Sequence, residues 1–271
     1  RSEGDYVTGK VMTGKVKRMD ESGAYALENR LTANTQFGSV DLVAITLERL
    51  ELSAGVSVLD VACGNGRYTA ECKRAVGDGA VHGVDQSESL IEDARNAARE
   101  ADLDIDYAVM DACDLQFASD MFDRVACTYA VYHFPSIARG LDEMRRVCAP
   151  VGAKIVLTGP APDNNEELYA WHARAGGTVA GGMGRTLYAD EVRAWAASRG
   201  LRHEWDVVGN PVVFPSVDAF LDYYAGTQLF VNNIDEAARP NSLSALATAL
   251  ENDGMDSVTV TKRIGVFEIW I

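Results

Sequence analysis

Between residues 56 and 158, short apolar runs alternate with segments in which apolar side chains recur every three or four positions. The segments with this longer spacing predict helices over 67–75, 87–101 and 136–148. The apolar runs predict five β-strands, over residues 56–62, 80–85, 105–111, 122–130 and 153–159. Regular alternation of strands and helices is typical of βαβ units. The pattern therefore predicts an α/β fold with a parallel sheet and helices on both faces.

Weaker patterns flank this unit on both sides. Residues 41–50 predict a helix before the first strand, and the glycine-rich residues 176–184 predict a loop. The closing residues 257–271 are β-branched and aromatic, long enough for one bent strand or two short ones. Further helices are predicted over 166–173, 189–198, 217–224 and 243–251, and a further strand over 203–209.

Composition narrows the class of protein. The 271 residues are 47% hydrophobic and carry a formal net charge of −15, which argues against a nucleic-acid partner because phosphate backbones are bound by Lys and Arg. No run approaches the ~18 apolar residues of a membrane span, and no signal-like segment opens the chain. The five cysteines form no CxxC pair, and no His/Cys/Asp spacing indicates a metal site. We therefore expect a cytoplasmic protein without membrane association or bound metal.

The stretch VLDVACGNGRYT, residues 58–69, predicts a strand, a turn of small residues and the start of a helix. Such a turn brings backbone N–H groups close to a ligand. A nucleoside-triphosphate P-loop needs Gly-Lys-Ser/Thr, whereas Gly66 is followed by Arg67 and Tyr68. A dinucleotide turn needs a third glycine, and Thr69 stands in that place. Both phosphate-binding interpretations therefore fit this turn poorly.

Acidic residues indicate a different ligand. Asp60 lies in the carboxyl-terminal part of the first predicted strand, and Asp85 and Asp111 end the next two. Ligands of open α/β sheets bind beyond the carboxyl ends of the strands, so the three carboxylates would face one crevice. A carboxylate at Asp85 can accept hydrogen bonds from both hydroxyls of a ribose. Three acids would repel a pyrophosphate and favour a cationic nucleoside without phosphate.

Five motifs in this order resemble those of class I S-adenosylmethionine-dependent methyltransferases, in particular the branch that acts on small molecules. The resemblance covers residues 56–158. Two departures are Ala62, where the family commonly has its first glycine, and APVGA in place of a PGG turn. The motifs are VLDVACGNG, VHGVDQS, VMDACDLQF, FDRVACTYAVYHF and RRVCAPVGAKIVLT.

The resemblance implies a Rossmann-like, doubly wound, mostly parallel seven-stranded sheet. It implies a helical N-terminal segment over the substrate (1–54) and a cofactor-binding core (55–158). It also implies a substrate-covering insertion with the final strands of the same sheet (159–271). The cofactor would be S-adenosylmethionine, leaving as S-adenosylhomocysteine.

Cofactor contacts carry over residue by residue. The resemblance assigns Asp85 to the ribose hydroxyls with Gln86 beside the adenine. It assigns Asp111 to the adenine amino group, with the backbone N–H of Ala112 nearby. Tyr129 would lie near the methionine amino group, mostly through its backbone. Four residues are assigned to the methionine end and the ribose: Asp60, Ala62, Gly64 and Gly66.

The predicted chemistry is methyl transfer by in-line displacement, in which the protein supplies proximity and orientation. His133 is the candidate general base because it follows the fourth strand at the crevice and titrates near neutrality. A packing or helix-capping role for His133 stays equally open. Tyr129 is a second catalytic candidate, as a residue that orients the acceptor.

The leading hypothesis is an enzyme that methylates O, N or C of a small organic acceptor, such as a specialised metabolite. One alternative is a non-catalytic S-adenosylmethionine-binding sensor or scaffold. Another is a nucleotide-dependent oxidoreductase, which Thr69 and Asp111 disfavour. The acceptor, the methylated atom and the oligomeric state stay open, with a homodimer as one candidate.

Overall fold

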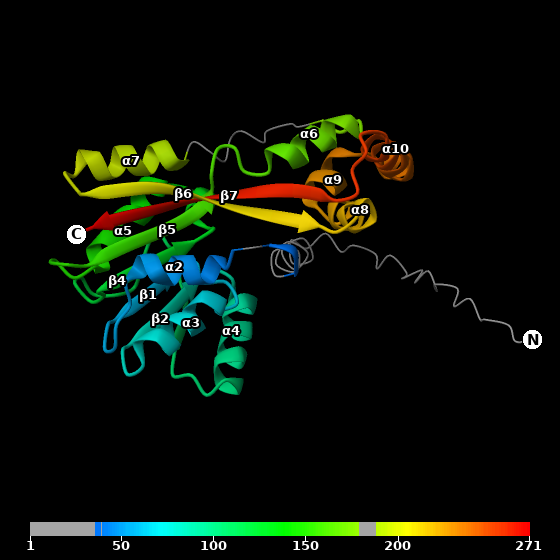
Figure 1. Ribbon diagram of the computed structural model, residues 1–271. Coiled ribbons are helices and arrows are strands. Elements are labelled where there is room, and N and C mark those ends of the chain that lie inside the picture. The colour runs from blue at the N-terminus through cyan, green and yellow to red at the C-terminus, as the bar shows by residue number, and fades with distance from the viewer. Residues whose placement is uncertain (1–35, 39, 179–187) are drawn as a thin grey trace, which may run out of the picture.

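The computed structural model describes residues 36–38, 40–178 and 188–271, which fold around one seven-stranded sheet in the order β3-β2-β1-β4-β5-β7-β6 (Figure 1). β1 to β5 run parallel, and β7 is antiparallel to both β5 and β6. The predicted mostly parallel, doubly wound sheet is therefore confirmed. The strands are β1 (Val58–Val61), β2 (Val81–Asp85), β3 (Asp106–Val109), β4 (Arg124–Thr128), β5 (Lys154–Pro160), β6 (His203–Phe214) and β7 (Val258–Trp270).

Helices cover both faces of the sheet, because neighbouring residues of a strand point to opposite faces. Val58 of β1 packs in one apolar core with α2 (Leu42–Leu50) and α3 (Arg67–Val76). The next residue, Leu59, packs in a second core with α5 (Ile137–Val147) and α7 (Tyr188–Ser198). A further helix, α4 (Glu88–Glu100), packs on β2 and β3.

The helix starts follow their capping residues. The Asp41 carboxylate accepts hydrogen bonds from the N–H groups of Val43 and Ala44 at the start of α2. The Ser87 and Ser136 hydroxyls accept from the third residue beyond them at the starts of α4 and α5. These side chains satisfy N–H groups that have no partner within the helix. Ser87, the first residue of the helix predicted over 87–101, is thus the N-cap of α4.

The carboxyl-terminal half of β6 and the amino-terminal half of β7 extend beyond the other strands. A separate layer of helices, here called the cap, packs on these two halves. Its helices are α6 (Glu166–Arg174), α8 (Val217–Ala225), α9 (Gln228–Asn233) and α10 (Arg239–Asn252), which gather around the ends of these two strands (Figure 1). Their apolar side chains form a core of their own with strand residues such as Phe214 and Val260.

Two features of the cap differ from the predicted elements, and a third decides between two predicted alternatives. β6 continues to Phe214 rather than ending at residue 209, since Pro211 is tolerated on an edge strand. The closing segment, predicted as one bent strand or two short ones, forms one strand, β7. The short helix α9, which no pattern predicted, has a Thr227 N-cap but too few residues for a clear apolar period.

Of the predicted loop 176–184, residues 179–184 lie outside the described residues, as do residues 1–35 of the predicted N-terminal segment.

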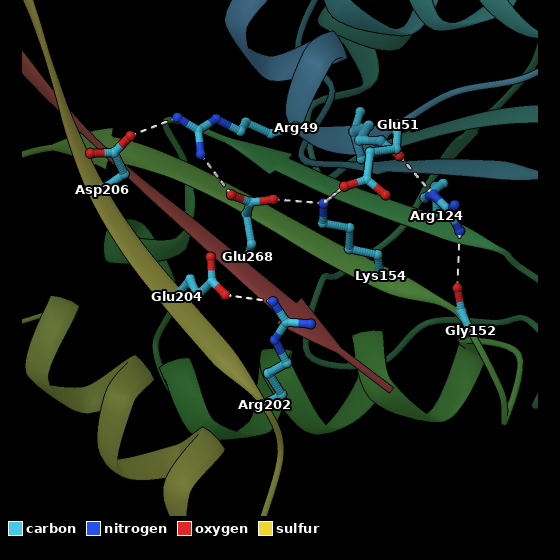
Figure 2. A network of polar contacts seen from close by, with 10 residues as sticks. Arg49, Glu51, Arg124, Gly152, Lys154, Arg202, Glu204, Asp206 and Glu268 are labelled. Atoms are coloured by element: carbon cyan, nitrogen blue, oxygen red, sulfur yellow. Dashed lines mark hydrogen bonds and ion pairs between the residues drawn. The ribbon is translucent and has the colours of Figure 1, made fainter.

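A network of ion pairs joins the end of α2 to the amino ends of β5 and β6 and to the carboxyl end of β7 (Figure 2). Lys154 of β5 lies 2.6 Å from Glu268 of β7 and 2.8 Å from Glu51. Arg49 of α2 bridges Glu268 and Asp206 of β6. The network therefore holds the end of α2 against three strands.

The described helices include none that is long and apolar enough to cross a membrane. Within the same ranges, no group of three His, Cys, Asp or Glu side chains is arranged to hold a metal ion. All five cysteines are buried free thiols.

Candidate functional site

Asp60 lies at the centre of the sheet and is completely buried. Its Oδ2 accepts a 2.6 Å hydrogen bond from the Thr69 hydroxyl on α3, whereas Oδ1 meets no hydrogen-bond donor of the described residues. Burial raises the pKa of Asp60 to about 7, and the nearby Asp85 carboxylate adds to the rise, against the lowering effect of the Thr69 hydrogen bond. The sequence-predicted acid is therefore a fully buried group, and one of its two oxygens has no hydrogen-bond donor among the described residues.

The turn after β1 uses left-handed backbone at three of its residues, Ala62 (φ 59°), Gly64 (φ 57°) and Gly66 (φ 78°). At Gly64, a Cβ would meet no atom of the described residues within 4 Å beyond its chain neighbours, so they leave the open side of the turn uncovered. At Gly66, a Cβ would lie on the ring of Tyr107 and clash. Gly64 therefore leaves room for a ligand, while Gly66 is required for packing. Ala62 stands where glycine would be less strained.

Asp85 ends β2 next to this turn. Its Oδ2 accepts from the backbone N–H of Gly64 and its Oδ1 from the N–H of Ser87, both at 2.9 Å. Each oxygen keeps a second lone pair, so the carboxylate can still accept from two hydroxyls. The structure thus brings Asp60, Gly64 and Asp85 together, as the sequence predicted.

The third acid, Asp111, lies beyond β3 with an exposed side chain. Its Oδ1 accepts a 2.8 Å hydrogen bond from the N–H of Cys113, which closes a turn around the half-buried Ala112. Gln86 is exposed directly after Asp85. These residues lie at the same edge of the sheet as Asp85, because β2 and β3 are parallel neighbours.

Tyr129 and His133 follow β4 at the same edge. Tyr129 has φ 56°, a left-handed conformation that is uncommon for a residue other than glycine, and its N–H donates to the carbonyl of Thr158. His133 ends a short 3₁₀ helix, η1 (Val131–His133), with an exposed side chain, and its ring lies 4.4 Å from that of Tyr132. Since Ser136 is the N-cap of α5, the helix-capping role considered for His133 falls to Ser136.

Sequence reasoning missed three side chains around the turn. It treated Thr69 as a misfit for a third glycine, whereas the Thr69 hydroxyl binds Asp60. Burial raises the pKa of Tyr68 to about 12. The Tyr107 hydroxyl donates to the carbonyl of Gly66 at 3.5 Å. The sequence predicted only that these residues lie in a helix or a strand. It could not predict their contacts, because each contact joins two different elements of the fold.

Aromatic side chains of the flanks largely form the core of the cap. Phe214, Phe220, Tyr224 and Phe230 are buried in it. His172 is also buried there, and its Nδ1 lies 2.6 Å from the Tyr224 hydroxyl. These residues thus support the cap.

Residues 58–152 match the family model described as a methyltransferase domain. This span contains β1 to β4 and the whole cluster around Asp60 and Asp85. Among solved structures, an S-adenosylmethionine-dependent methyltransferase from Aquifex aeolicus has a TM-score of 0.55 at 17% identity, covering 70% of this chain and 93% of that one. The chain therefore contains a methyltransferase domain at residues 58–152 and shares its fold with a structure named as an S-adenosylmethionine-dependent methyltransferase.

Relatives of the methyltransferase domain are diverse. The methyltransferase GfsG of Streptomyces halstedii is 37% identical over 122 residues, which are 43% of this chain and 44% of that protein. The ubiquinone/menaquinone biosynthesis C-methyltransferase UbiE of Bdellovibrio bacteriovorus is 36% identical over 104 residues, 38% of this chain and 44% of UbiE. The matches thus span less than half the length of these relatives.

The fold also occurs in a protein with a different chemistry. The crystal structure of the [4+2]-cyclase SpnF has a TM-score of 0.58 at 18% identity, covering 92% of this chain and 93% of that one. This similarity extends over the cap as well as the methyltransferase domain.

The cluster fits S-adenosylmethionine, the cofactor of this class. Space above Gly64 allows close approach to the backbone, and Asp85 keeps acceptor lone pairs for a ribose. Oδ1 of Asp60 has no hydrogen-bond donor among the described residues. The ammonium group of the cofactor could supply that donor.

Proposed function

We propose that this protein transfers a methyl group from S-adenosylmethionine to a small organic acceptor. The observation that carries the proposal is the pair of carboxylates, Asp60 and Asp85, on either side of the open turn at Gly64 within the methyltransferase domain. This arrangement favours a ligand that brings positive charge and hydroxyl donors.

The cofactor supplies an activated methyl group on a sulfonium. The chain's own contribution would be to bind and orient: Asp85 for the ribose hydroxyls, Asp60 for the methionine ammonium, and Gln86, Asp111 and Ala112 for the adenine. Orientation and proximity are the main protein terms for a donor that is already activated.

The acceptor would lie beyond β4, beside Tyr129 and His133. We propose His133 as the base for a hydroxyl acceptor, since its exposed ring can exchange a proton with solvent and is steadied by Tyr132. The left-handed backbone at Tyr129 is the kind of local strain that concentrates at functional sites. Tyr129 is accordingly proposed to orient the acceptor or the methionine amino group through its backbone.

A small organic molecule, rather than a macromolecule, is supported as the acceptor by the relatives, since one of them is named for quinone biosynthesis. The formal charge of −15 argues against nucleic acid as the acceptor. We also propose that the protein acts in the cytoplasm and forms a homodimer. Residues 1–54 and 159–271 are proposed to cover the substrate.

The second candidate is a protein that binds S-adenosylmethionine without transferring its methyl group. This candidate is supported by SpnF, which is named as a cyclase and has a similar fold. The fold alone therefore does not require methyl transfer.

Turnover separates the two candidates. The purified chain would be incubated with methyl-labelled S-adenosylmethionine and panels of phenols, hydroxyquinones, enols and amines. Label recovered in an acceptor, with matching S-adenosylhomocysteine, supports methyl transfer. Tight binding of the cofactor with no labelled product from any panel favours the binding protein. A chain that binds no cofactor would contradict both.

A further inference from the structure

The contact between Thr69 and Asp60 differs from the hydrogen bonds that the structure shows at Asp85 and Asp111, the other two acids at this edge of the sheet. Thr69 and Asp60 are both fully buried, and the hydroxyl of Thr69 donates to Oδ2 at 2.6 Å. By contrast, Asp85 and Asp111 accept from backbone N–H groups at the rim. The Thr69 side chain therefore determines which oxygen of Asp60 stays available.

Among the residues that the structure describes, the groups that face Asp60 include no positive partner. Asp85 of β2 is the charged side chain that the described residues bring near enough to affect it, and its sign is the same. The other titratable neighbours are thiols and phenols whose pKa values are raised by burial, so they are neutral at pH 7. They are Cys63 in the turn, Tyr68 and Cys72 of α3, Tyr107 of β3 and Cys127 of β4.

A buried carboxyl with a neighbouring negative charge and no cation is stable in its neutral form. That is consistent with the pKa of about 7 for Asp60 in the cofactor-free protein. A cation placed at Oδ1 would reverse the balance, because an opposite charge at close range favours the carboxylate.

We propose that Thr69 is the positioning residue of Asp60, and that the Thr69–Asp60 pair holds one proton in the free protein and releases it to solvent when a positively charged cofactor binds. The inference rests on the proposed function, since it takes S-adenosylmethionine as the ligand of the crevice.

Two consequences distinguish this role from simple packing. Cofactor affinity rises with pH as long as the free protein must lose the proton, and it levels off above the pKa of Asp60. Because the Thr69 hydrogen bond favours the carboxylate, removing it moves the inflection to higher pH, by about half to one pH unit.

The test is isothermal titration of S-adenosylmethionine into the full chain from about pH 5.5 to about pH 8.5, in paired buffers of different ionisation enthalpy. The wild type should release close to one proton at about pH 6 and lose that release above about pH 8. Asp60→Asn should abolish it. The cofactor's own amine titrates near pH 8, and the two proteins offer it different partners at residue 60. Asp60 is therefore isolated by comparing the two proteins below about pH 7, where the free amine is already protonated.

Three threonine variants test the positioning role. Thr69→Val should move the inflection upward, and Thr69→Ser, which keeps the hydroxyl, should restore it. Thr227→Val is the matched control. Like Thr69, Thr227 is buried and its hydroxyl donates a hydrogen bond, but it lies in the cap and its acceptor is a backbone carbonyl. It should lower the melting temperature without moving the inflection.

The outcomes separate the two levels of the account. Normal cofactor binding with no proton release in the wild type, or an unmoved inflection in a folded Thr69→Val, would overturn the inference and leave the proposed function standing. Absence of cofactor binding by the folded wild type would overturn the proposed function itself.

Discussion

Nζ of Lys154 lies 2.6 Å from Oε2 of Glu268, and both side chains are almost completely buried, at 1% and 8% exposure. Each of them has a second partner of opposite charge, Glu51 for Lys154 and Arg49 for Glu268 (Figure 2). The hydrogen bond from Lys154 lowers the pKa of Glu51. The network thus compensates two charges that would be costly to bury alone.

Replacing Lys154 by Met should cost about 3–5 kcal/mol of the free energy of unfolding, because Glu268 would remain buried with half of its partners. Urea denaturation measures this. The double variant Lys154→Met/Glu268→Leu should recover part of the loss. Glu204→Gln is the control, since its pair with Arg202 is exposed and should change stability by less than about 1 kcal/mol. A Lys154→Met protein as stable as the control would show that this pair contributes nothing.

Asp85→Ala should reduce the affinity for S-adenosylmethionine at least about tenfold, because two hydrogen bonds to a charged acceptor are lost, each worth ~1.5–3 kcal/mol. Isothermal titration provides the measurement. The control is Asp106→Ala, an aspartate 83% exposed at the opposite end of the neighbouring strand, which should bind normally. Equal affinities for the two variants would remove Asp85 from the cofactor site.

Gly64 and Gly66 should respond differently to a side chain. Gly64→Val should abolish cofactor binding. It should lower the unfolding free energy by only about 1–2 kcal/mol for the left-handed backbone, since its Cβ meets no atom in the described part of the chain. Gly66→Ala should lower the melting temperature further, because its Cβ clashes with Tyr107. Titration and thermal melts of both proteins check this. Normal binding by Gly64→Val would mean that the turn does not approach the ligand.

Asp60 should give the cofactor-free protein an unusual dependence of stability on pH. The folded protein keeps this proton up to about pH 7, whereas the unfolded chain loses it near the ordinary aspartate pKa of 3.8. Stability therefore falls as pH rises between these values, by up to about 1.4 kcal/mol per pH unit. Denaturation of wild type and Asp60→Asn across this range isolates the effect as the difference between the two curves.

Asp123 is the control of opposite sign. Hydrogen bonds from Ser57 lower its pKa, so its contribution is present at neutral pH and is lost as pH falls through the lowered value. If the difference between wild type and Asp60→Asn resembled that for Asp123→Asn, the carboxyl of Asp60 would be ionised in the free protein.

His133→Ala should lose a step worth about 10²–10⁴-fold in kcat if the acceptor is a hydroxyl, while still binding the cofactor. The wild-type rate should then rise through the histidine's pKa with increasing pH. With a neutral amine as acceptor, no base is needed and the variant should show mainly a raised KM. Rates against pH for both proteins decide between these. An unchanged rate and pH profile would make His133 a packing residue.

Much of the fold was readable from local signals. Ser87 and Ser136 mark helix starts through their own backbone contacts, and the apolar runs of β1, β2, β4 and β5 identify buried strands. The position of β7 between β5 and β6 was not readable from local signals, because antiparallel insertion depends on pairing between distant segments. The same reason hid the full length of β6, whose outer half is held by β7 and the cap.

The candidate site was predictable where the residue type itself carries the chemistry. Asp60, Asp85 and the glycines meet at one edge because parallel strands end together. What the sequence could not show is burial: Asp60 looked like a crevice acid but is fully enclosed, and Thr69 looked like a poor substitute for glycine but binds it. Such contacts depend on how α3 packs over β1.

The central claim is that the cofactor binds at the carboxyl ends of β1, β2 and β3. A crystal structure with S-adenosylhomocysteine tests it most directly. The account predicts density over Gly64, with the ribose hydroxyls on the Asp85 carboxylate and the methionine amino group toward Asp60. Density for the ligand at another part of the fold, or a ribose away from Asp85, would contradict it.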